Sequence, residues 1–394
     1  MKKLISILLA AGVAMPVFAQ FYRTNNADTD WSNLENWTTD AEGTVPATSV
    51  PGRGNNVQWY LGDAAVGTKT VVTGDLGNIS IDRLNVKSAD LTFSYVNVNI
   101  GNRINFGAVD GATAATEDNR NTINVVLDNT TMKTWLCYFA NQNYTDLNFT
   151  LKNNSTFQIT ATTWNQYQGV GSKYSTTHIT IEKGSTFTTG TSLTTNGTHS
   201  AGQYSTSVMD VYGNLNAAAI YTTDQNTSTS TINIYGSANI VSTGSTNANQ
   251  KNSYLNFIMQ DVDVNKMTYI TAGTVENSDV DAIFTTGDIL NINRFTITVD
   301  VKDFSFDGDY DEGESYAIAL FKLTNATETF STDVISIVNA DKMGQGWELA
   351  DEALFWNEST LFLNVISVPV PEPSTYAAIF GALALAFAAY RRKR

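Results

Sequence analysis

The sequence contains very little cysteine, histidine or proline: one, two and six residues of 394. A single cysteine excludes an intramolecular disulfide, so the fold has to be stabilised by burial of apolar side chains and by backbone pairing. Cys137 lies within the apolar run 134–139, and we interpret it as a small buried hydrophobic residue. His178 and His199 have no further histidine or cysteine at metal-ligand spacing, so the sequence predicts no metal site built on them.

Positive charge is also scarce. Without its two terminal segments, which are described below, the chain from residue 20 to about residue 370 has 17 basic and 37 acidic residues and a net charge of −20. Nucleic-acid binding requires Lys and Arg to neutralise phosphates, so this composition argues against a nucleic-acid partner. Charged residues make up only 15% of the sequence, and Thr, Asn, Ser and Gly fill much of the chain. Because strand formers are plentiful and the helix formers Lys and Glu are few, we predict an all-β fold class.

Sequence motifs of catalysis are missing. The chain has no nucleophile motif, phosphate-binding loop or dinucleotide fingerprint. Glycosidase or lyase chemistry needs carboxylates that converge on one point. The middle of the chain offers only scattered ones, namely Asp128, Asp146, Glu182, Asp210 and Asp224. We therefore predict no catalytic residues, no cofactor and no enzymatic activity.

One loop is rich in acidic residues. Asp307, Asp309 and Asp311 alternate as carboxylates do at the start of an EF-hand calcium loop. The later positions of that motif do not match, because Glu312 stands where the turn glycine belongs and Ile318 where the bidentate Glu belongs. We interpret the loop as a solvated acidic turn, with weak calcium binding as the alternative.

The N-terminal segment is predicted to be a signal peptide. Two lysines precede an apolar stretch over 4–13, and small residues two apart follow it. This pattern is typical of a secretory signal over 1–19 with cleavage between Ala19 and Gln20. It implies export across the inner membrane, with the Sec translocon and signal peptidase as partners.

The C-terminal segment 369–394 has three parts in a fixed order. Pro371-Glu372-Pro373 is a stiff extended stop, and 374–390 is uncharged and mostly apolar. The chain then closes with the cations Arg391, Arg392, Lys393 and Arg394. A helix over the middle part would be roughly 26 Å long, just short of a hydrocarbon core of about 30 Å. The sequence therefore predicts one transmembrane helix over 374–390, with the basic end as a cytoplasmic stop.

This tail resembles the PEP-CTERM sorting signal of exported bacterial proteins. The resemblance rests on the Pro-Glu-Pro motif, the apolar span and the basic end, in that order. It implies that an exosortase-type enzyme recognises the motif and removes the tail, so that the inner membrane holds the precursor only transiently. The mature chain is then expected in the cell envelope, at the cell surface or in an extracellular matrix, where an exopolysaccharide is a further expected partner.

The middle of the chain repeats. Pairs of apolar residues two apart, each followed by a turn signal, begin at steps of 24, 30, 30, 23 and 23 residues. The first members of these pairs are Val125, Phe149, Ile179, Met209, Ile232 and Leu255. One rung of a β-solenoid has about 20–30 residues, and rungs bury their inward side chains by stacking in parallel. We predict a parallel β-solenoid over 116–262, with a β-sandwich as the alternative.

The repeat is flanked by two further regions. Residues 20–115 are predicted to form an N-terminal β cap with the first strands, and 263–368 a C-terminal β region. The segment from Trp31 to Trp37 resembles the opening of exported proteins with autotransporter-associated β-strand repeats. We interpret Trp31, Trp37 and Trp59 as plugs of the open end of a β core, with a sugar-stacking platform as the alternative.

Two functions are consistent with the sequence. The first is an exported cell-envelope or extracellular protein with a structural or adhesive role. The alternative is a carbohydrate-binding or polysaccharide-degrading β-helix protein, for which the aromatic loop with Trp164, Tyr167 and Tyr174 is the best support.

Overall fold

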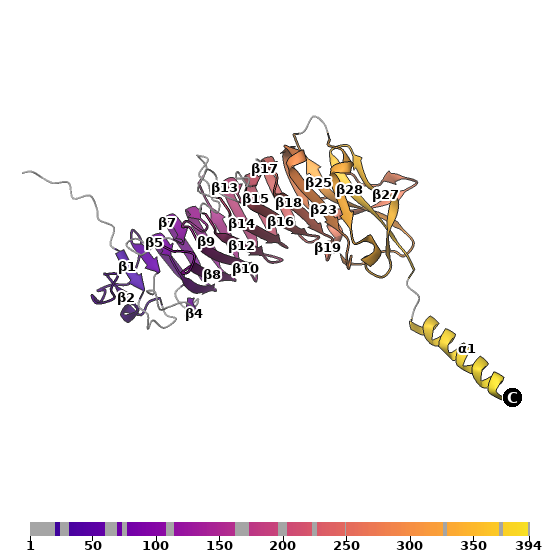
Figure 1. Cartoon of the computed structure of the whole chain (residues 1–394), viewed down its shortest axis with the longest axis horizontal. Helices are drawn as coiled ribbons and strands as arrows, with labels where there is room; N and C mark the ends of the chain where they lie inside the picture. The colour runs from indigo at the N-terminus through magenta and orange to yellow at the C-terminus, as the bar shows by residue number, and fades with distance from the viewer. Residues whose placement is uncertain are drawn as a thin grey trace, which may run out of the picture.

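The fold consists almost entirely of β-strands. The computed structural model describes residues 20–23, 31–59, 69–72, 77–107, 114–161, 173–195, 203–222, 227–248, 250–325, 329–369 and 373–392. Within these ranges the one α-helix is α1 (Pro373–Arg392), at the C-terminal end (Figure 1). The short 3-10 helices are η1 (Leu34–Asn36), η4 (Val264–Lys266), η5 (Ile292–Arg294), η6 (Thr332–Val334) and η7 (Ala340–Lys342). The predicted all-β class is confirmed.

Two long sheets form the body. The 16-stranded sheet runs in the order β2 (Trp37–Thr38), β1 (Gln20–Arg23), β3 (Asn56–Trp59), β5 (Asn78–Val86), β7 (Asn97–Phe106), β9 (Thr131–Tyr138), β11 (Thr156–Ile159), β13 (Thr186–Thr194), β15 (Asn214–Thr222), β17 (Asn239–Ala248), β22 (Phe284–Leu290), β25 (Ser315–Leu323), β20 (Met267–Thr271) and β21 (Thr274–Val275), with β28 (Thr360–Ser367) and β27 (Trp347–Asn357) joined to β25. The 10-stranded sheet runs in the order β26 (Ile335–Val338), β23 (Phe295–Asp300), β18 (Ser253–Ile258), β16 (Thr229–Tyr235), β14 (Thr206–Val211), β12 (Thr176–Ile181), β10 (Thr145–Lys152), β8 (Asn121–Asp128), β6 (Ala89–Ser94) and β4 (Lys69–Val72). A small third sheet pairs β19 (Val262–Asp263) with β24 (Phe306–Asp307).

Successive strands of the body alternate between the two long sheets. As a result β8, β10 and β12 are parallel neighbours in one sheet, while β9, β11 and β13 are parallel neighbours in the other. We call one strand from each sheet, with its turns, a rung. Figure 1 shows the rungs side by side along the long axis of the body. This repeat-like parallel architecture fits the predicted β-solenoid, whereas the sheets of the alternative β-sandwich are antiparallel.

The predicted repeat positions are register partners. Phe149 pairs with Val125 on one side and with Ile179 on the other, and Met209 continues the row. Ile232, Leu255 and Ile297 extend it. All of these side chains are buried. The row shows why the repeat was visible in the sequence: each rung must place an apolar side chain at the same inward position.

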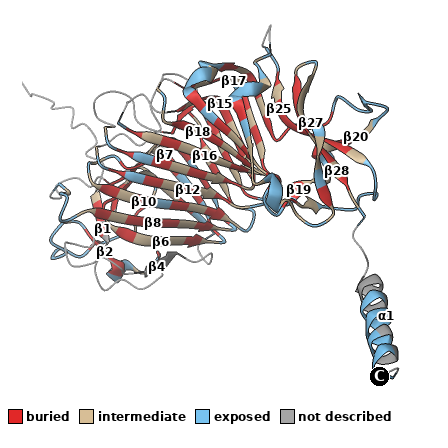
Figure 2. Ribbon diagram, turned by 45° about the vertical axis from the view of Figure 1, so that its right-hand side comes forward, coloured by how far each residue is buried: buried red, intermediate tan, exposed pale blue. Residues whose placement is uncertain are grey.

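The space between the sheets is filled by the inward side chains of both. Figure 2 shows buried residues alternating with less buried ones along the strands. An aromatic cluster lies near the middle of the stack, formed by Phe106, Phe139, Phe149, Phe157 and Phe187. Its contacting rings have centroids 4.9 to 6.2 Å apart. Burying one such side chain contributes about 1.5–3 kcal/mol, so this cluster is a main source of stability.

Parallel pairing extends beyond the predicted range 116–262 in both directions. On the N-terminal side β3 pairs with β5 and β4 with β6, and on the C-terminal side β22 pairs with β25 and β23 with β26. The later rungs were hidden because β19, β20 and β21 are inserted between β18 and β22, which breaks the regular spacing.

Antiparallel strands lie at both ends of the 16-stranded sheet. β1 pairs with β2 at one end, and at the other β25 pairs with β28 and with β20. At the N-terminal end Trp37 is fully buried, and its indole Nε1 donates a hydrogen bond of 2.9 Å to the Trp31 carbonyl. Trp31 is only 5% exposed, and the two ring centroids are 4.7 Å apart. Both rings therefore act as a plug and not as a sugar platform; the side chain of Trp59 lies outside the described residues.

The C-terminal tail forms a helix, as predicted, but the prediction that this helix spans a membrane has to be corrected. Among the described residues, no helix is long and apolar enough to cross a membrane. α1 begins with Pro373, Ser374 and Thr375 and ends with Arg391 and Arg392, and 377–389 is its uninterrupted apolar part. Such a segment is about 20 Å long, against a hydrocarbon core of about 30 Å. The predicted transmembrane helix over 374–390 is therefore not supported.

Parts of both processing signals lie outside the described residues. These parts are 1–19, including Ala19, together with Pro371, Glu372, Lys393 and Arg394. Gln20 begins β1 and Pro373 begins α1. Arg391 and Arg392 close the last turn of α1, where positive charge interacts favourably with the helix dipole. The signal peptide and the sorting motif stay predictions.

Candidate binding cleft

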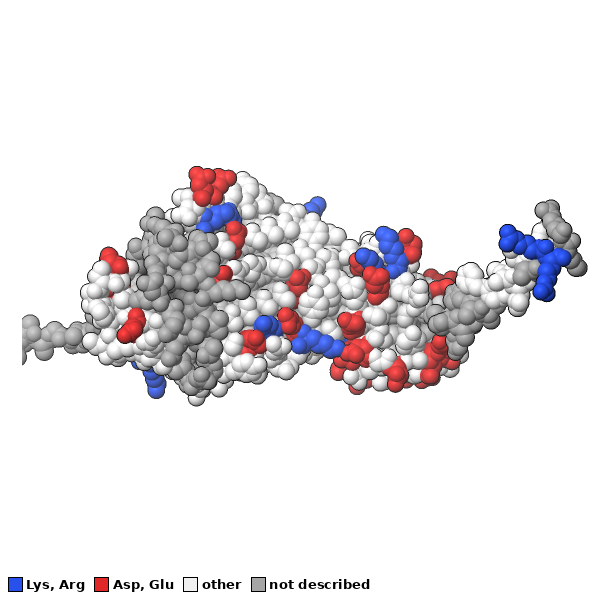
Figure 3. Space-filling view, turned by 90° about the horizontal axis from the view of Figure 1, so that it is seen from below, with Lys and Arg blue, Asp and Glu red and all other residues white. Residues whose placement is uncertain are grey.

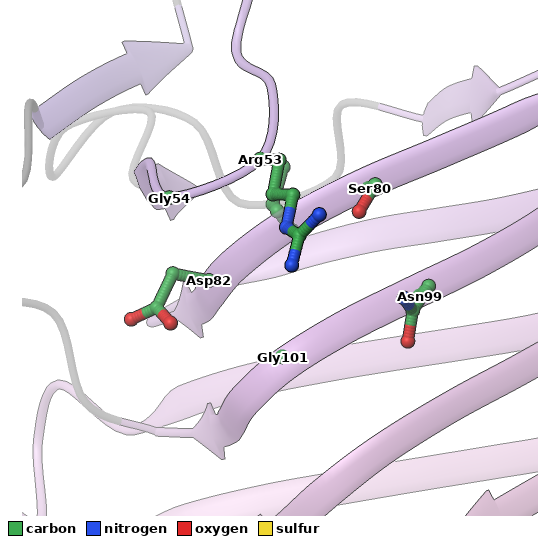
Figure 4. A pocket seen from close by; sticks show the side chains of 7 residues that line it. Arg53, Gly54, Ser80, Asp82, Asn99 and Gly101 are labelled. Carbon is green, nitrogen blue, oxygen red and sulfur yellow. The ribbon is translucent and has the colours of Figure 1, made fainter.

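A cleft opens on the outer face of the 16-stranded sheet, over β5 and β7. Its volume is about 460 Å³, which is within the range of about 300–1,000 Å³ that is typical of small-molecule sites. The lining residues are Arg53, Gly54, Ser80, Ile81, Asp82, Asn99 and Gly101. Figure 4 shows the Arg53 side chain reaching from the loop above into the space between Ser80 and Asp82. Asn99 and Gly101 lie on the adjacent strand.

A tight turn over 51–55 holds Arg53 above the sheet. Gly54 has a φ of +84°, a left-handed conformation that favours glycine. The Asn55 carbonyl accepts a hydrogen bond of 2.8 Å from the backbone N–H of Asp82, which fixes the turn to β5. Arg53 itself is exposed, so its guanidinium is available to a ligand.

The floor of the cleft is hollow because the pairing of β5 with β7 is irregular. Ser80 pairs with Asn99, and the register then shifts, so that β7 has one residue more than β5 in this stretch. Gly101 lies at the shift and brings no side chain. A Cβ placed on it would lie 3.7 Å from Asp82 Oδ1, an ordinary contact distance. The glycine therefore leaves open space that a larger side chain would fill.

The Asp82 carboxylate has an unsatisfied acceptor. Its Oδ2 is buried and accepts no hydrogen bond from any residue that the structure describes. Oδ2 instead forms an ion pair with Arg83 Nε, which lies 3.5 Å away and likewise has no hydrogen-bond partner among those residues. Asp82 Oδ1 lies on the side of Gly101, 3.7 Å from the Cβ position there, and can accept a hydrogen bond from a ligand.

An exposed tryptophan flanks the cleft on the next strand. The irregular pairing of β7 with β9 places Trp135 beside the Gly101 position. Trp135 is 42% exposed, whereas its neighbours Thr134 and Leu136 are buried. The indole therefore faces outward, and its ring offers an apolar surface with a polar N–H at one edge.

The 10-stranded sheet carries a line of side-chain hydrogen bonds on its outer face. His178 Nε2 lies 2.6 Å from Asp210 Oδ2, and the Asn233 amide donates to Asp210 Oδ1 at 2.7 Å. Asn256 donates to Asn233 Oδ1 at 2.9 Å, and the Thr298 hydroxyl donates to Asn256 Oδ1 at 2.7 Å. We call these five side chains the amide ladder. Each of its bonds joins neighbouring rungs, so the ladder stabilises the stack.

A second ladder is aromatic. Tyr144, Tyr174 and Tyr204 occupy equivalent turns before β10, β12 and β14, with ring centroids 5.1 Å apart in each neighbouring pair. The interplanar angles are 9° and 4°, so the rings are stacked face to face. The Arg120 guanidinium lies 5.8 Å from the centre of the Tyr144 ring and forms an ion pair with Asp146. Because neighbouring rings cover one another's faces, the stack presents mainly ring edges to a ligand.

The aromatic loop proposed from the sequence is only partly visible. Tyr174 is the middle ring of the tyrosine stack, so it supports packing between rungs. Trp164 and Tyr167 lie outside the described residues, as does His199.

The acidic loop is engaged in other contacts. The described residues include no group of three or more His, Cys, Asp or Glu side chains placed to hold a metal ion. Asp307, Asp309 and Asp311 therefore do not converge on a calcium site. Asp307 forms an ion pair with Lys183, and its hydrogen bond is the main reason why the pKa of Lys183 is raised. Asp311 Oδ2 accepts a hydrogen bond of 2.8 Å from the Tyr269 hydroxyl.

Cys137 is a buried thiol, as the sequence predicted. It is 0% exposed and forms part of the core. Burial raises the pKa of its thiol well above the usual value, because a thiolate would be desolvated there. The site therefore provides no reactive nucleophile.

Negative charge is concentrated in the C-terminal part of the body. Residues 263–368 include 19 Asp and Glu against five Lys and Arg. On the face drawn in Figure 3, acidic side chains gather over the C-terminal end of the body. The middle of that face has fewer charged side chains and consists mostly of uncharged residues. The cleft lies at the other end of the stack, away from this acidic region.

In comparisons with known proteins, no family model, curated protein or solved structure matches this chain. The two resemblances seen in the sequence therefore stay predictions. The function has to be inferred from the residues themselves.

The cleft residues were not identified from the sequence. Trp135 had been read as part of the apolar run 134–139, but the strict alternation of β9 would have assigned it to the outer face. The turn around Arg53 has the Pro- and Gly-rich sequence Pro51-Gly52-Arg53-Gly54, which is typical of a turn. What the sequence did not show is that this turn lies over Asp82 and Asn99, because that depends on the register between rungs.

Proposed function

We propose that the chain is an exported protein of the cell surface or extracellular matrix with a structural or adhesive role. Its body is a parallel β-solenoid and its first 19 residues are a signal peptide. Its C-terminal tail is a PEP-CTERM sorting signal that an exosortase-type enzyme processes. The observation that carries this proposal is the continuous stack of parallel rungs, which has few charges over the middle of the face drawn in Figure 3.

The stack suits a protein that has to present a surface over a distance. Neighbouring strands lie about 4.8 Å apart, so the ten strands of the 10-stranded sheet span about 43 Å. Inner rungs are held by backbone pairing on both sides, and the amide and tyrosine ladders add side-chain contacts between the rungs from β10 to β23. Stability from stacking also explains how an exported chain with one cysteine dispenses with disulfides.

The cleft supports binding over catalysis. Asp82 is the one carboxylate among its described lining residues. Hydrolysis of a glycosidic bond generally needs a pair of carboxylates about 5–10 Å apart, one of which acts as a general acid. A single carboxylate beside an arginine can hold a ligand but does not provide that pair.

The helix of the tail exposes apolar side chains, as a segment that binds another protein does. The described large apolar side chains of α1 are 51–74% exposed: Ile379, Phe380, Leu383, Leu385, Phe387 and Tyr390. A row of exposed apolar side chains marks an interaction site. This exposure supports the proposed sorting role, in which a processing enzyme takes up and removes the segment.

The fate of the tail tests this proposal. In a host that makes an exosortase-type enzyme, we expect the intact mass of the surface-exposed chain to lack α1 and the residues before Gln20. Replacing Pro371, Glu372 and Pro373 with alanine should leave the tail in place and reduce the amount of chain at the surface. A control with Asp351→Ala and Glu352→Ala, which alters two exposed residues of the body, should behave as the original. Surface chain that retains α1 would contradict the proposal.

A further inference from the structure

We propose that the cleft over β5 and β7 binds a neutral saccharide. In this site Trp135 stacks on a sugar ring while Arg53, Asp82 and Asn99 form hydrogen bonds with its hydroxyls. The inference rests on the adhesive function proposed above and deepens it by naming the site and the class of ligand.

The hydrogen-bonding groups of the cleft are complementary to hydroxyl groups. Arg53 can only donate and the Asp82 carboxylate can only accept, while Asn99 and Ser80 can do both. A sugar hydroxyl also donates and accepts, so a polyhydroxylated ligand can satisfy all of these groups together. On Asp82 the oxygen that faces the cleft is Oδ1, beside Gly101, because Oδ2 is buried against Arg83.

The charges of the cleft favour a neutral ligand. Arg53 and Asp82 give the lining a net charge of zero. The net charge of −20 of the body disfavours an anionic ligand, and Arg53 disfavours a cationic one. A metal ion is disfavoured because the described residues include no group of three potential ligands.

Trp135 and Gly101 supply the apolar part of the site. An exposed indole at the rim of a polar cleft can pack against the C–H face of a sugar ring while its N–H stays in contact with water. Gly101 lies beside it and has no side chain, so a flat ring can approach the sheet closely. The tyrosine stack lacks this arrangement, because its rings cover one another.

The test is a titration of the purified full-length chain with sugars of known charge. The neutral probes are cellotriose, maltotriose, laminaritriose and tri-N-acetylchitotriose, and trigalacturonic acid is the acidic counterpart. Isothermal calorimetry and tryptophan fluorescence report binding. We expect at least one neutral trisaccharide to bind, and Trp135→Ala or Asp82→Asn to weaken that binding about tenfold or more.

Gly101→Val is the sharpest variant. A Cβ at this position meets only ordinary contacts, so the chain should fold while the added methyl groups project into the cleft, keep a sugar ring off the sheet and abolish binding. Tyr95→Ala is the matched control, because Tyr95 is 67% exposed and lies outside the cleft. Circular dichroism melting curves confirm that each variant is folded.

Three results would overturn the proposal. They are the absence of binding to every neutral trisaccharide, binding that persists in Gly101→Val, and binding of the acidic trisaccharide alone. Because the titration uses purified chain in solution, its outcome does not depend on whether the tail is processed. Failure of the saccharide site and failure of the sorting function can therefore be told apart.

Discussion

At the scale of single residues, the spacing between rungs depends on glycine. A Cβ on Gly236 would lie 2.7 Å from the Gln260 carbonyl and 2.8 Å from Val262 Cα, which are backbone atoms of the next rung. We therefore expect Gly236→Ala to lower the free energy of unfolding by about 1–3 kcal/mol, measured by urea denaturation. Gly52→Ala is the control, because the nearest atom there is 3.9 Å away. Equal losses in both variants would contradict this explanation.

The burial of Cys137 predicts how the free energy of unfolding depends on pH. Since the pKa of its thiol is raised in the folded chain, the unfolded chain loses the proton first, above a pH of about 8.5. The folded chain then binds more protons than the unfolded one, so the free energy of unfolding falls as the pH rises. Below that pH the thiol is protonated in both states and its contribution is constant.

Comparison with Cys137→Ala isolates this contribution, because all other titrating groups are the same in both chains. We expect the difference in the free energy of unfolding between the two chains to narrow between pH 8 and pH 10 in urea denaturation curves, at about 1.4 kcal/mol per pH unit once the unfolded thiol is ionised. The folded thiol should also resist iodoacetamide at pH 8. Rapid alkylation of the folded chain would show that the thiol is accessible, contrary to its burial.

Single residues also show how far the sequence could be read. The burial of Cys137 and of Trp37 was predicted, because both lie in apolar or aromatic contexts that are typical of a core. The exposure of Trp135 was not, since an apolar run does not reveal on its own which side chains point inward. The unsatisfied acceptor of Asp82 depends on three-dimensional contacts and had no signal in the sequence.

At the scale of elements, the amide ladder should contribute to the cohesion of the 10-stranded sheet. Asn233 makes two of its bonds, to Asp210 and to Asn256. Each bond is worth about 0.5–1.5 kcal/mol, so Asn233→Ala should lower the free energy of unfolding by about 1–3 kcal/mol. Thr231→Ala alters an outward residue of the same strand outside the ladder and should have less effect. A loss of the same size in both would assign the effect to the strand and not to the ladder.

The repeat was recognisable in the sequence while the ladders were not. The inward positions Phe149, Ile179 and Met209 follow one another at steps of 30 residues and are always apolar. Tyr144, Tyr174 and Tyr204 follow the same steps, so the tyrosine stack could have been found by extending the comparison to the turns. The amide ladder mixes His, Asp, Asn and Thr, and such a mixture has no common pattern.

At the scale of the whole molecule, stability should be distributed rung by rung. Phe157 contacts Phe139, Phe149 and Phe187 in the central cluster. Phe157→Ala should cost about 3–5 kcal/mol. In a stack where rungs contact only their neighbours, hydrogen exchange should rise mainly in β9 to β13. Phe157→Leu, which keeps most of the apolar volume, should cost less. A uniform rise in exchange along the whole chain would indicate that the body unfolds as one unit.

The fold class was predictable because composition and periodicity act along the whole chain. The extent of the stack was not, since insertions such as β19 to β21 interrupt the period without interrupting the pairing. For the tail, the sequence predicted a feature that the structure does not support. Its order of motifs predicted a membrane span, but among the described residues no helix is long and apolar enough to cross a membrane.

The two ends of the chain lie at opposite ends of the stack, with β1 at one and α1 beyond the other (Figure 1). The backbone hydrogen bonds between rungs run along the axis that joins these ends. A pulling force between a surface attached at one end and a ligand held in the cleft near the other would therefore load the rungs in series. Rungs would detach one after another, and each of 23 to 30 residues would release about 80–100 Å of extended chain. A protein built in this way yields gradually under shear and dissipates mechanical work before the attachment is lost.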